Sequence, residues 1–426
     1  MKKAAFLLIL FCFLYPIFPK VSPIPIDRIL QLLGFTLLVF NQRDTVKLIS
    51  SIYTRRFLLL TFVLLCLAFI VQLQVIGTYD TYFIIRVVNV FFEFFSAYFV
   101  FSIGRWAYKN LSIGTVLYYI VLAAVLQAVI GIIFYINPVY YVSYYSLLNA
   151  EIAHKEFEDT MALLNVRFVG IGSSFFSGTI KYGVAFFSLL ILPFVHQNRL
   201  TSNKLFYWAA FLIIVFGGMM TGRSFFIAMI LGGIMVTAAR SQSVLLFVMN
   251  NVKIVLLCVF LIPLVYFLST AILDMSKFER AFNFAFELFI NASEGKGFQS
   301  SSTNKQLEMY VFPDETRTWL IGDAKMQNSD GGYYMFTDIG YLRLIYYFGL
   351  PATVFFVYLM IRYCKILVSL GAFRPLTYFF IAVFAWHIIL GFKGLAFHSY
   401  YFVLFLVVLT LSQRKLSKEL NNHQNY

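Results

Sequence analysis

Residues 274–337 are a long polar stretch in an otherwise largely apolar chain, reading DMSKFERAFNFAFELFINASEGKGFQSSSTNKQLEMYVFPDETRTWLIGDAKMQNSDGGYYMFT. They carry nine acidic and six basic side chains, a net charge of −3. Two adjacent membrane spans can be joined by a few residues. A connection of about sixty residues therefore predicts a loop with a role of its own.

The composition on either side of this stretch predicts an all-α polytopic membrane protein, with residues 1–426 forming a single integral domain. Apolar residues make up 61% of the chain and charged residues 12%, whereas a typical soluble domain is about 25% charged. Apolar runs of about 20 residues recur, and each can cross a hydrocarbon core about 30 Å thick as a helix. The runs lack the alternation of a membrane barrel.

About twelve transmembrane helices are expected. Their approximate bounds are 4–19, 26–40, 57–76, 83–104, 111–136, 168–195, 205–220, 224–239, 252–273, 338–361, 376–391 and 395–411. The apolar N-terminus follows Lys2 and Lys3 without a small-residue cleavage site, which predicts an uncleaved first span. All four cysteines lie in apolar runs, so neither a disulfide framework nor a CxxC metal site is expected.

The net charge of +14 is a topology signal rather than a sign of nucleic-acid binding. Alternate short connectors hold the lysines and arginines, as the positive-inside rule expects for cytoplasmic loops. The prediction is a multi-pass membrane protein with both termini cytoplasmic. Residues 274–337 then form the large external loop, and residues 137–167 form a second one.

Several charges inside or beside the spans are not explained by topology, and such residues usually face a cavity, a partner or a substrate. Arg86, Asn89 and Glu93 share one helix face, so Glu93 either neutralises Arg86 or lines a cavity with it. Arg223 follows the helix-breaking Gly222. Ser224 is a candidate N-cap, so a helix is expected to begin here. A helix N-terminus attracts anions, and Arg223 adds a positive charge at that point. The alternative is an arginine contacting lipid headgroups.

Arg167 precedes a Gly/Ser-rich segment that leads to Lys181, and Arg343 lies one turn into the tenth span. Asp338 and Arg343 are five residues apart, about 140° around a helix, so they are not expected to pair. Arg86, Arg167, Arg223 and Arg343 all fall near the external face. Four arginines at one depth suit a pyrophosphate-linked lipid. Lys393, His387 and His398 could line the same cavity, although a structural role for the histidines is the alternative.

The first part of the large loop has helical spacing. Phe278, Phe282, Phe286 and Phe289 share one face, while Glu279, Arg280, Asn283 and Glu287 take the other. An amphipathic helix is expected, either on the outer membrane surface or packed on the bundle.

Three segments resemble the O-antigen polymerase (Wzy) and ligase superfamily, together with the layout of about a dozen spans and one large late loop. They are RFVGIGSSFFSG at 167–178, MMTGRSFFIAMI at 219–230 and TDIGYLRLIYYFGLPATVFF at 337–356. The resemblance implies a GT-C-like glycosyltransferase of the bacterial inner membrane without metal or other cofactor, which takes undecaprenyl-pyrophosphate-linked oligosaccharides on the periplasmic side. Membrane lipids and a chain-length regulator protein are the further partners it implies.

The resemblance also implies roles for single residues. Arg167 and Arg223 would bind the pyrophosphate, Arg343 would stabilise the developing charge, and Asp338 would deprotonate the acceptor hydroxyl, with Asp323 or Asp330 as substitutes. Arg86 joins the pyrophosphate-binding set through its position near the external face. Lys181, Glu93, His387 and His398 would line the cavity. Ligases of the superfamily carry a histidine in the large loop, whereas none lies between His196 and His387 here. A polymerase of O-antigen or capsule repeat units is therefore favoured over a ligase. The loop of about sixty residues favours it over a lipid-linked oligosaccharide flippase, which usually has short external loops.

Overall fold

The computed structural model describes residues 1–20, 24–74, 80–148, 167–173, 175–195, 204–240, 275–297, 299–328, 332–371 and 373–423. Within these ranges the chain is helical and contains no strand, which confirms the predicted all-α class. The predicted ninth span, 252–273, lies outside the described residues.

Six helices are long and apolar enough to cross a membrane. They are α4 (Ile52–Gln74), α5 (Tyr82–Ala107), α6 (Ile113–Ile136), α9 (Phe175–Val195), α10 (Lys204–Thr221) and α17 (Leu350–Gly371). Three more have shorter apolar stretches: α11 (Phe225–Arg240), α18 (Arg374–Leu390) and α19 (Ser399–His423). The described residues therefore give a multi-pass helical protein, with fewer full-length spans than the twelve predicted.

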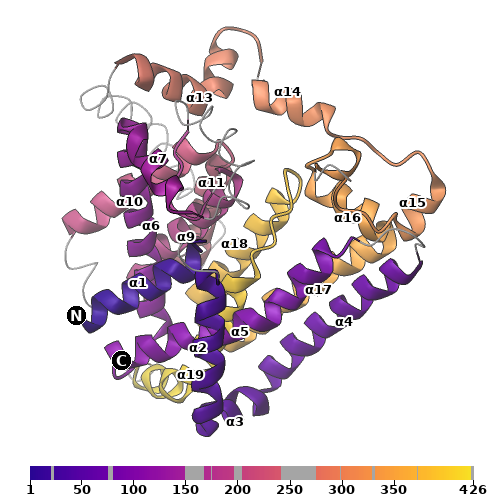
Figure 1. Ribbon diagram of the computed structural model, residues 1–426. Helices are drawn as coiled ribbons and strands as arrows, with labels where there is room; N and C mark the ends of the chain where they lie inside the picture. Colours follow the sequence, from indigo (N-terminus) through magenta and orange to yellow (C-terminus); the bar gives the residue numbers. More distant parts are fainter. Residues whose placement is uncertain are drawn as a thin grey trace.

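The remaining helices are short. They are α1 (Lys2–Leu14), α2 (Ile26–Phe40), α3 (Gln42–Ser50), α7 (Pro138–Ser146), α13 (Met275–Ser293), α14 (Ser301–Glu308), α15 (Thr316–Ile321), the 3₁₀ turn η1 (Tyr334–Phe336) and α16 (Gly340–Phe348). Helices α13, α14 and α15 lie at one end of the bundle, and α3 lies at the opposite end (Figure 1). The polar stretch that stood out in the sequence thus covers one end of the molecule.

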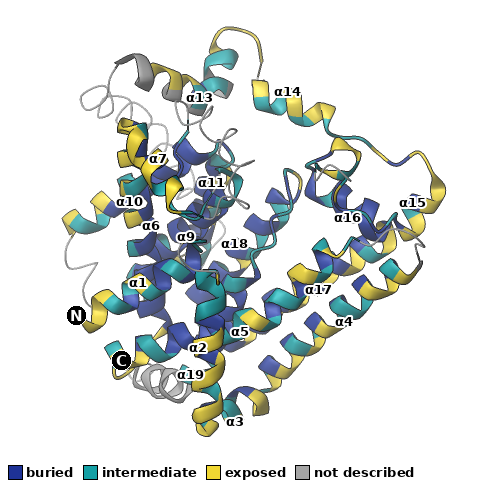
Figure 2. Ribbon diagram, viewed as in Figure 1, coloured by how far each residue is buried: buried dark blue, intermediate teal, exposed yellow. Residues whose placement is uncertain are grey.

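Helix α9 is the centre of the bundle and α4 lies at its edge. Helix α9 packs against α6, α10, α11 and α18, and 78% of its apolar segment is buried, against 28% for α4. The contrast is visible in Figure 2, where α4 shows many exposed positions. Close packing needs small residues on α9: a Cβ at Gly183 would lie 2.4 Å from the indole nitrogen of Trp386.

Among the predicted spans whose bounds differ in the structure, two bear on the site. The expected helix 338–361 is broken at Gly349, where φ is +78°, into α16 and α17. Pro351 follows within the first turn of α17, where a missing N–H costs little. The expected helix 168–195 begins only at Phe175. Residues 167–173 are irregular, and their backbone is satisfied by side chains such as Gln127, which donates to Ile171 O (2.9 Å).

Candidate functional site

The large loop and the turn before α5 meet at the same end of the bundle. The Asp80 carboxylate accepts hydrogen bonds from the backbone N–H groups of Met326 (2.6 Å) and Gln327 (2.9 Å). Gln72 donates to Ala324 O (2.8 Å). These contacts fix the second half of the loop above α4 and α5. They bring the loop exit, which holds Asp338, beside the start of α5, which holds Arg86.

Arg343 and Asp338 form the first half of the site. Arg343 Nη1 lies 3.8 Å from Asp338 Oδ1, so the prediction that the two residues do not pair is wrong. Helical geometry does not apply to them, because α16 begins only at Gly340 and Asp338 lies in extended chain before it. The Arg343 side chain is 4% exposed, and its guanidinium lies 4.4 Å from the ring centre of Tyr333.

The side-on edge of the Arg343 guanidinium has no hydrogen-bond partner among the described residues. Both Nε and Nη2 are buried there without a hydrogen bond to any described group. These two N–H groups point in parallel and match the two oxygens of a phosphate or carboxylate. A buried arginine that leaves this edge unpaired carries a free-energy cost. The arrangement therefore offers a bidentate anion receptor beside a carboxylate, with the Tyr333 ring packed over it.

Asp338 has the properties of a proton acceptor. Burial raises the pKa of its carboxyl to about 6, and the nearby Arg343, Tyr333 and Lys393 partly oppose that shift. A general base works best when its pKa lies near the operating pH. The side chain is still 38% exposed, so a hydroxyl group from outside can reach it.

Arg86 lies near Arg343, but its hydrogen-bond partner is not the predicted one. Its guanidinium donates to the Tyr82 hydroxyl and lies 4.7 Å from that ring, and the side chain is exposed. Arg343 lies 5.9 Å from the same ring. Of the two alternatives for Glu93, neutralisation of Arg86 does not occur among the described residues, because Glu93 bonds Ser399 and Arg86 bonds Tyr82. The shared helix face is real, but Tyr82 is only one turn from Arg86, whereas Glu93 is two turns away.

Arg167 and Arg223 form the second half of the site, and both pack against one aromatic ring. Their guanidinium carbons lie 4.3 Å and 4.2 Å from the ring centre of Phe284 on α13. Burial, followed by the charge of Arg223, lowers the pKa of Arg167 to about 10. Arg167 Nε is buried without a partner, and the described residues offer this guanidinium only ring contacts.

Arg223, in contrast, uses all three of its nitrogens. It donates through Nε to the Phe284 carbonyl, through Nη1 to Ser302 Oγ (2.8 Å) and through Nη2 to the Glu287 carboxylate. Glu287 also accepts from the backbone N–H of Ser301 (2.8 Å). Arg223 therefore holds α13 and the start of α14 on the bundle. The anion predicted at this helix N-terminus is an internal carboxylate in this structure.

Lys393 connects the two halves. Its ammonium group donates to Ser224 Oγ (3.1 Å), so Ser224 serves as a contact for Lys393. Burial and the positive charges of Arg167 and Arg223 lower the pKa of Lys393 to about 8, and the charge of Asp338 partly opposes this. The four arginines are thus brought to one end of the bundle as two pairs, with Lys393 between them.

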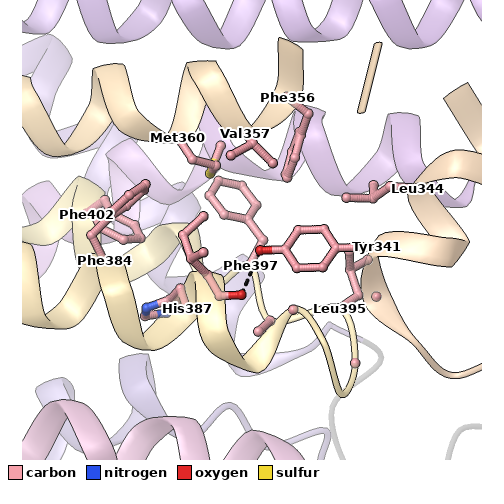
Figure 3. Close-up of a pocket in the computed structure, with 15 residues that line it drawn as sticks. Tyr341, Leu344, Phe356, Val357, Met360, Phe384, His387, Leu395, Phe397 and Phe402 are labelled. Atoms are coloured by element: carbon pink, nitrogen blue, oxygen red, sulfur yellow. Dashed lines mark hydrogen bonds between the residues drawn. The ribbon is translucent and has the colours of Figure 1, made fainter. Parts of the chain in front are cut away.

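The other predicted site residues lie deeper in the bundle. Lys181 is buried, donates to Gly172 O (3.1 Å) and lies 4.8 Å from the Tyr15 ring centre. His398 Nε2 pairs with Ser177 Oγ (3.3 Å). His387 lines an apolar cavity of about 40 Å³ between α16, α17 and α18, whose lining includes Phe356, Met360 and Phe397 (Figure 3). That volume holds about one water, so the cavity is too small for a sugar.

Asp323 and Asp330 are the predicted substitutes for Asp338 as the general base. Asp323 accepts hydrogen bonds from Thr318 Oγ1 (2.8 Å) and the Tyr334 hydroxyl (3.2 Å), so it stabilises the loop. Asp330 lies outside the described residues. On α13, Phe286 packs against Phe226 of α11, which favours the bundle-packed alternative at this residue.

Glu287, Phe284, Tyr82 and Tyr333 are the site residues that sequence reasoning missed. Glu287 carried one signal, because it is an acid on the polar face of a predicted helix in a protein with several unexplained cations. The tyrosines carried none in a chain with 28 of them. Comparisons of this chain with protein-family models, with curated proteins and with solved structures gave no significant match.

Proposed function

We propose that the protein is a membrane glycosyltransferase that polymerises glycan repeat units of an O-antigen or capsule, using undecaprenyl-pyrophosphate-linked oligosaccharides as both donor and acceptor. The observation that carries the proposal is the pairing of Asp338 with Arg343. A carboxyl whose pKa is raised to about 6 lies beside a guanidinium whose side-on edge has no hydrogen-bond partner in the described part of the chain. Base and anion receptor are the two groups that glycosyl transfer from a pyrophosphate requires.

In the proposed reaction, Asp338 takes the proton of an acceptor sugar hydroxyl, and the oxygen attacks the anomeric carbon of the donor. The bond from that carbon to the pyrophosphate oxygen breaks, and the lipid pyrophosphate leaves with the electron pair. Arg343, with Arg86 and Lys393 nearby, stabilises the charge that develops on the leaving group. The Arg343 side chain is only 4% exposed, so neighbouring side chains must move before a pyrophosphate can reach its guanidinium.

The proposal places the site on the periplasmic face of the inner membrane, with both termini cytoplasmic. Support comes from the location of α13, α14 and α15 at one end of the bundle and of α3, which carries Arg43 and Lys47, at the other (Figure 1). A topology with cations inside and the acidic loop outside fits this separation.

The decisive test is deletion of the gene followed by analysis of the surface glycan. A polymerase deletion leaves one repeat unit attached to its acceptor, and Asp338→Asn or Arg343→Ala should reproduce that pattern at normal protein abundance. Wild-type chain length in both variants would contradict the proposed mechanism.

A second candidate function is a flippase for the same lipid-linked oligosaccharides. It is favoured by the polar residues that continue from the arginines into the bundle, namely Lys181, Glu93, His387 and His398. Deletion of a flippase removes the attached glycan altogether, and the same gel separates the two outcomes. A ligase deletion would also remove the attached glycan, but would leave lipid-linked polymer in the membrane.

A further inference from the structure

A second cavity lies at the α3 end of the bundle, opposite the large loop (Figure 1). Its volume is about 310 Å³, against about 40 Å³ for the cavity beside His387. Helices α3, α4 and α19 pack against one another around it. A single water needs only about 10–15 Å³ of such volume, so this cavity has room for a much larger ligand.

The side chains around this cavity select an anion. Its lining consists of Lys47, Ser50, Ser51, Ile52, Tyr53, Thr410 and Leu411. Each polar side chain in that set can donate a hydrogen bond, and none is acidic. The Thr410 hydroxyl oxygen is buried and has no hydrogen-bond partner among the described residues. Because an unpaired buried hydroxyl carries a free-energy cost, a ligand that accepts its hydrogen bond is favoured.

Lys47 is available to such a ligand. Residues 41–56 carry four basic side chains and one acidic side chain, Asp44. The Asp44 carboxylate is already bonded to Arg105 (2.7 Å), the Tyr98 hydroxyl (3.1 Å) and the Asn41 amide (2.9 Å). Lys47 forms no ion pair with a described acid. The cavity therefore holds a positive charge that the described part of the protein does not neutralise.

The surroundings of the cavity indicate an anion with a hydrocarbon tail. Arg55 Nη2 donates to the Ser50 carbonyl (2.9 Å), which adds a second cation at the rim. Further along α4 the outer surface is apolar, and Leu59 and Phe62 are 61% and 55% exposed. Basic pockets between transmembrane helices bind the headgroups of anionic lipids. A lipid phosphate in the cavity would leave its acyl chains beside this apolar surface.

We propose that the cavity between α3, α4 and α19 binds the phosphate group of an anionic phospholipid, whose acyl chains lie along α4. Lys47 pairs with the phosphate, and the hydroxyl groups of the lining, including that of Thr410, donate hydrogen bonds to it. The site goes beyond the proposed glycosyl transfer, because it lies at the other end of the bundle and uses neither Asp338 nor Arg343.

Native mass spectrometry of the full-length protein tests the site without any assay of activity. Phosphatidylglycerol should bind at least about fivefold more tightly than zwitterionic phosphatidylcholine, the factor expected for one basic side chain at an anionic headgroup. Lys47→Gln should abolish this preference. Arg43→Gln is the matched control, since Arg43 is exposed one turn earlier on α3 and does not line the cavity. Equal loss in both variants would show a general attraction to surface charge and would overturn the site.

Two further measurements place the ligand and identify its source. Thr410→Val keeps the charge and the shape of the side chain, and it should weaken phosphatidylglycerol binding by about threefold or more through loss of one hydrogen bond. Unchanged binding would overturn the placement of the phosphate in this cavity. Inorganic phosphate in large molar excess should not displace the lipid, because it lacks the acyl chains that contribute apolar contact. Displacement by phosphate would overturn the assignment to a phospholipid.

Discussion

Arg223 and Arg343 look equivalent in sequence, since each is a lone arginine beside an apolar run at the same end of the chain's spans. Both are nearly fully buried, with exposed fractions of 5% and 4%. Their hydrogen bonds nevertheless differ completely. Arg223 has a protein partner for each nitrogen, whereas two of the three nitrogens of Arg343 have no hydrogen-bond partner among the residues that the structure describes.

This difference separates two uses of a buried guanidinium. An arginine whose nitrogens are all hydrogen-bonded within the protein stabilises the structure. Removing Arg223 leaves Glu287 without its charge partner. An arginine with an open bidentate edge can bind a ligand. We therefore expect substitutions at the two positions to fail in different ways. The following predictions are ordered by the size of the expected effect.

Arg343→Ala should have the largest effect on glycan polymerisation. Loss of one charge-stabilising group at a developing anion typically costs about 10²–10³ in rate. Arg343→Lys should restore little, since a lysine has no planar pair of N–H groups. The measurement is glycan chain length in cells and the initial rate with purified lipid-linked repeat units. Full rescue by lysine would show that charge alone matters at this position.

Asp338→Asn should reduce polymerisation by at least about 10²-fold through loss of the general base. In the wild type, the rate should rise with pH and level off above about pH 6, because the carboxylate is the active form and the pKa is raised to about 6. The pH dependence of stability has the opposite sign. Because the pKa of Asp338 is higher in the folded protein, its contribution to stability is present at low pH and is lost as the pH rises through about 6. A rate that is flat between about pH 5 and pH 8 would remove Asp338 from the mechanism.

Arg223→Ala should act mainly on the structure of the loop. Breaking a buried ion pair costs about 3–5 kcal/mol, so α13 should detach and the segment 275–308 should become sensitive to limited proteolysis. Glu287→Gln should show the same sensitivity to a smaller degree. The exchanged pair Arg223→Glu with Glu287→Arg should recover part of the protection. Unchanged proteolysis in Arg223→Ala would show that Arg223 is not the anchor.

Arg86→Ala should have the smallest effect, less than about tenfold on the polymerisation rate. Its guanidinium is exposed and bonded only to Tyr82 among described residues, and exposed charges are largely screened by water and salt. Its effect should therefore shrink as salt is raised, whereas that of Arg343→Ala should not. The same rate assay in low and high salt provides the comparison.

Sequence reasoning predicted the parts of this site that depend on local chemistry. It singled out Arg86, Arg167, Arg223, Arg343 and Asp338 because a charge beside a membrane span is costly. It placed them at one end of the bundle through the positive-inside rule, and the structure brings them there as two pairs. It was wrong about Asp338 and Arg343, because it assumed a helix across residues that precede the first turn of α16.

The chain by itself determined the helical class, most helix locations and the set of charged candidates, since these follow from apolar run length and the cost of charge in lipid. Only the tertiary structure decided which of the two arginines has all its nitrogens hydrogen-bonded and which leaves the side-on edge of its guanidinium available to a ligand. That choice depends on Glu287, Ser302, Tyr82 and Tyr333, which lie up to 261 residues away in the chain. Hydrogen-bond partners over such separations are set by packing, and single-sequence patterns do not encode them.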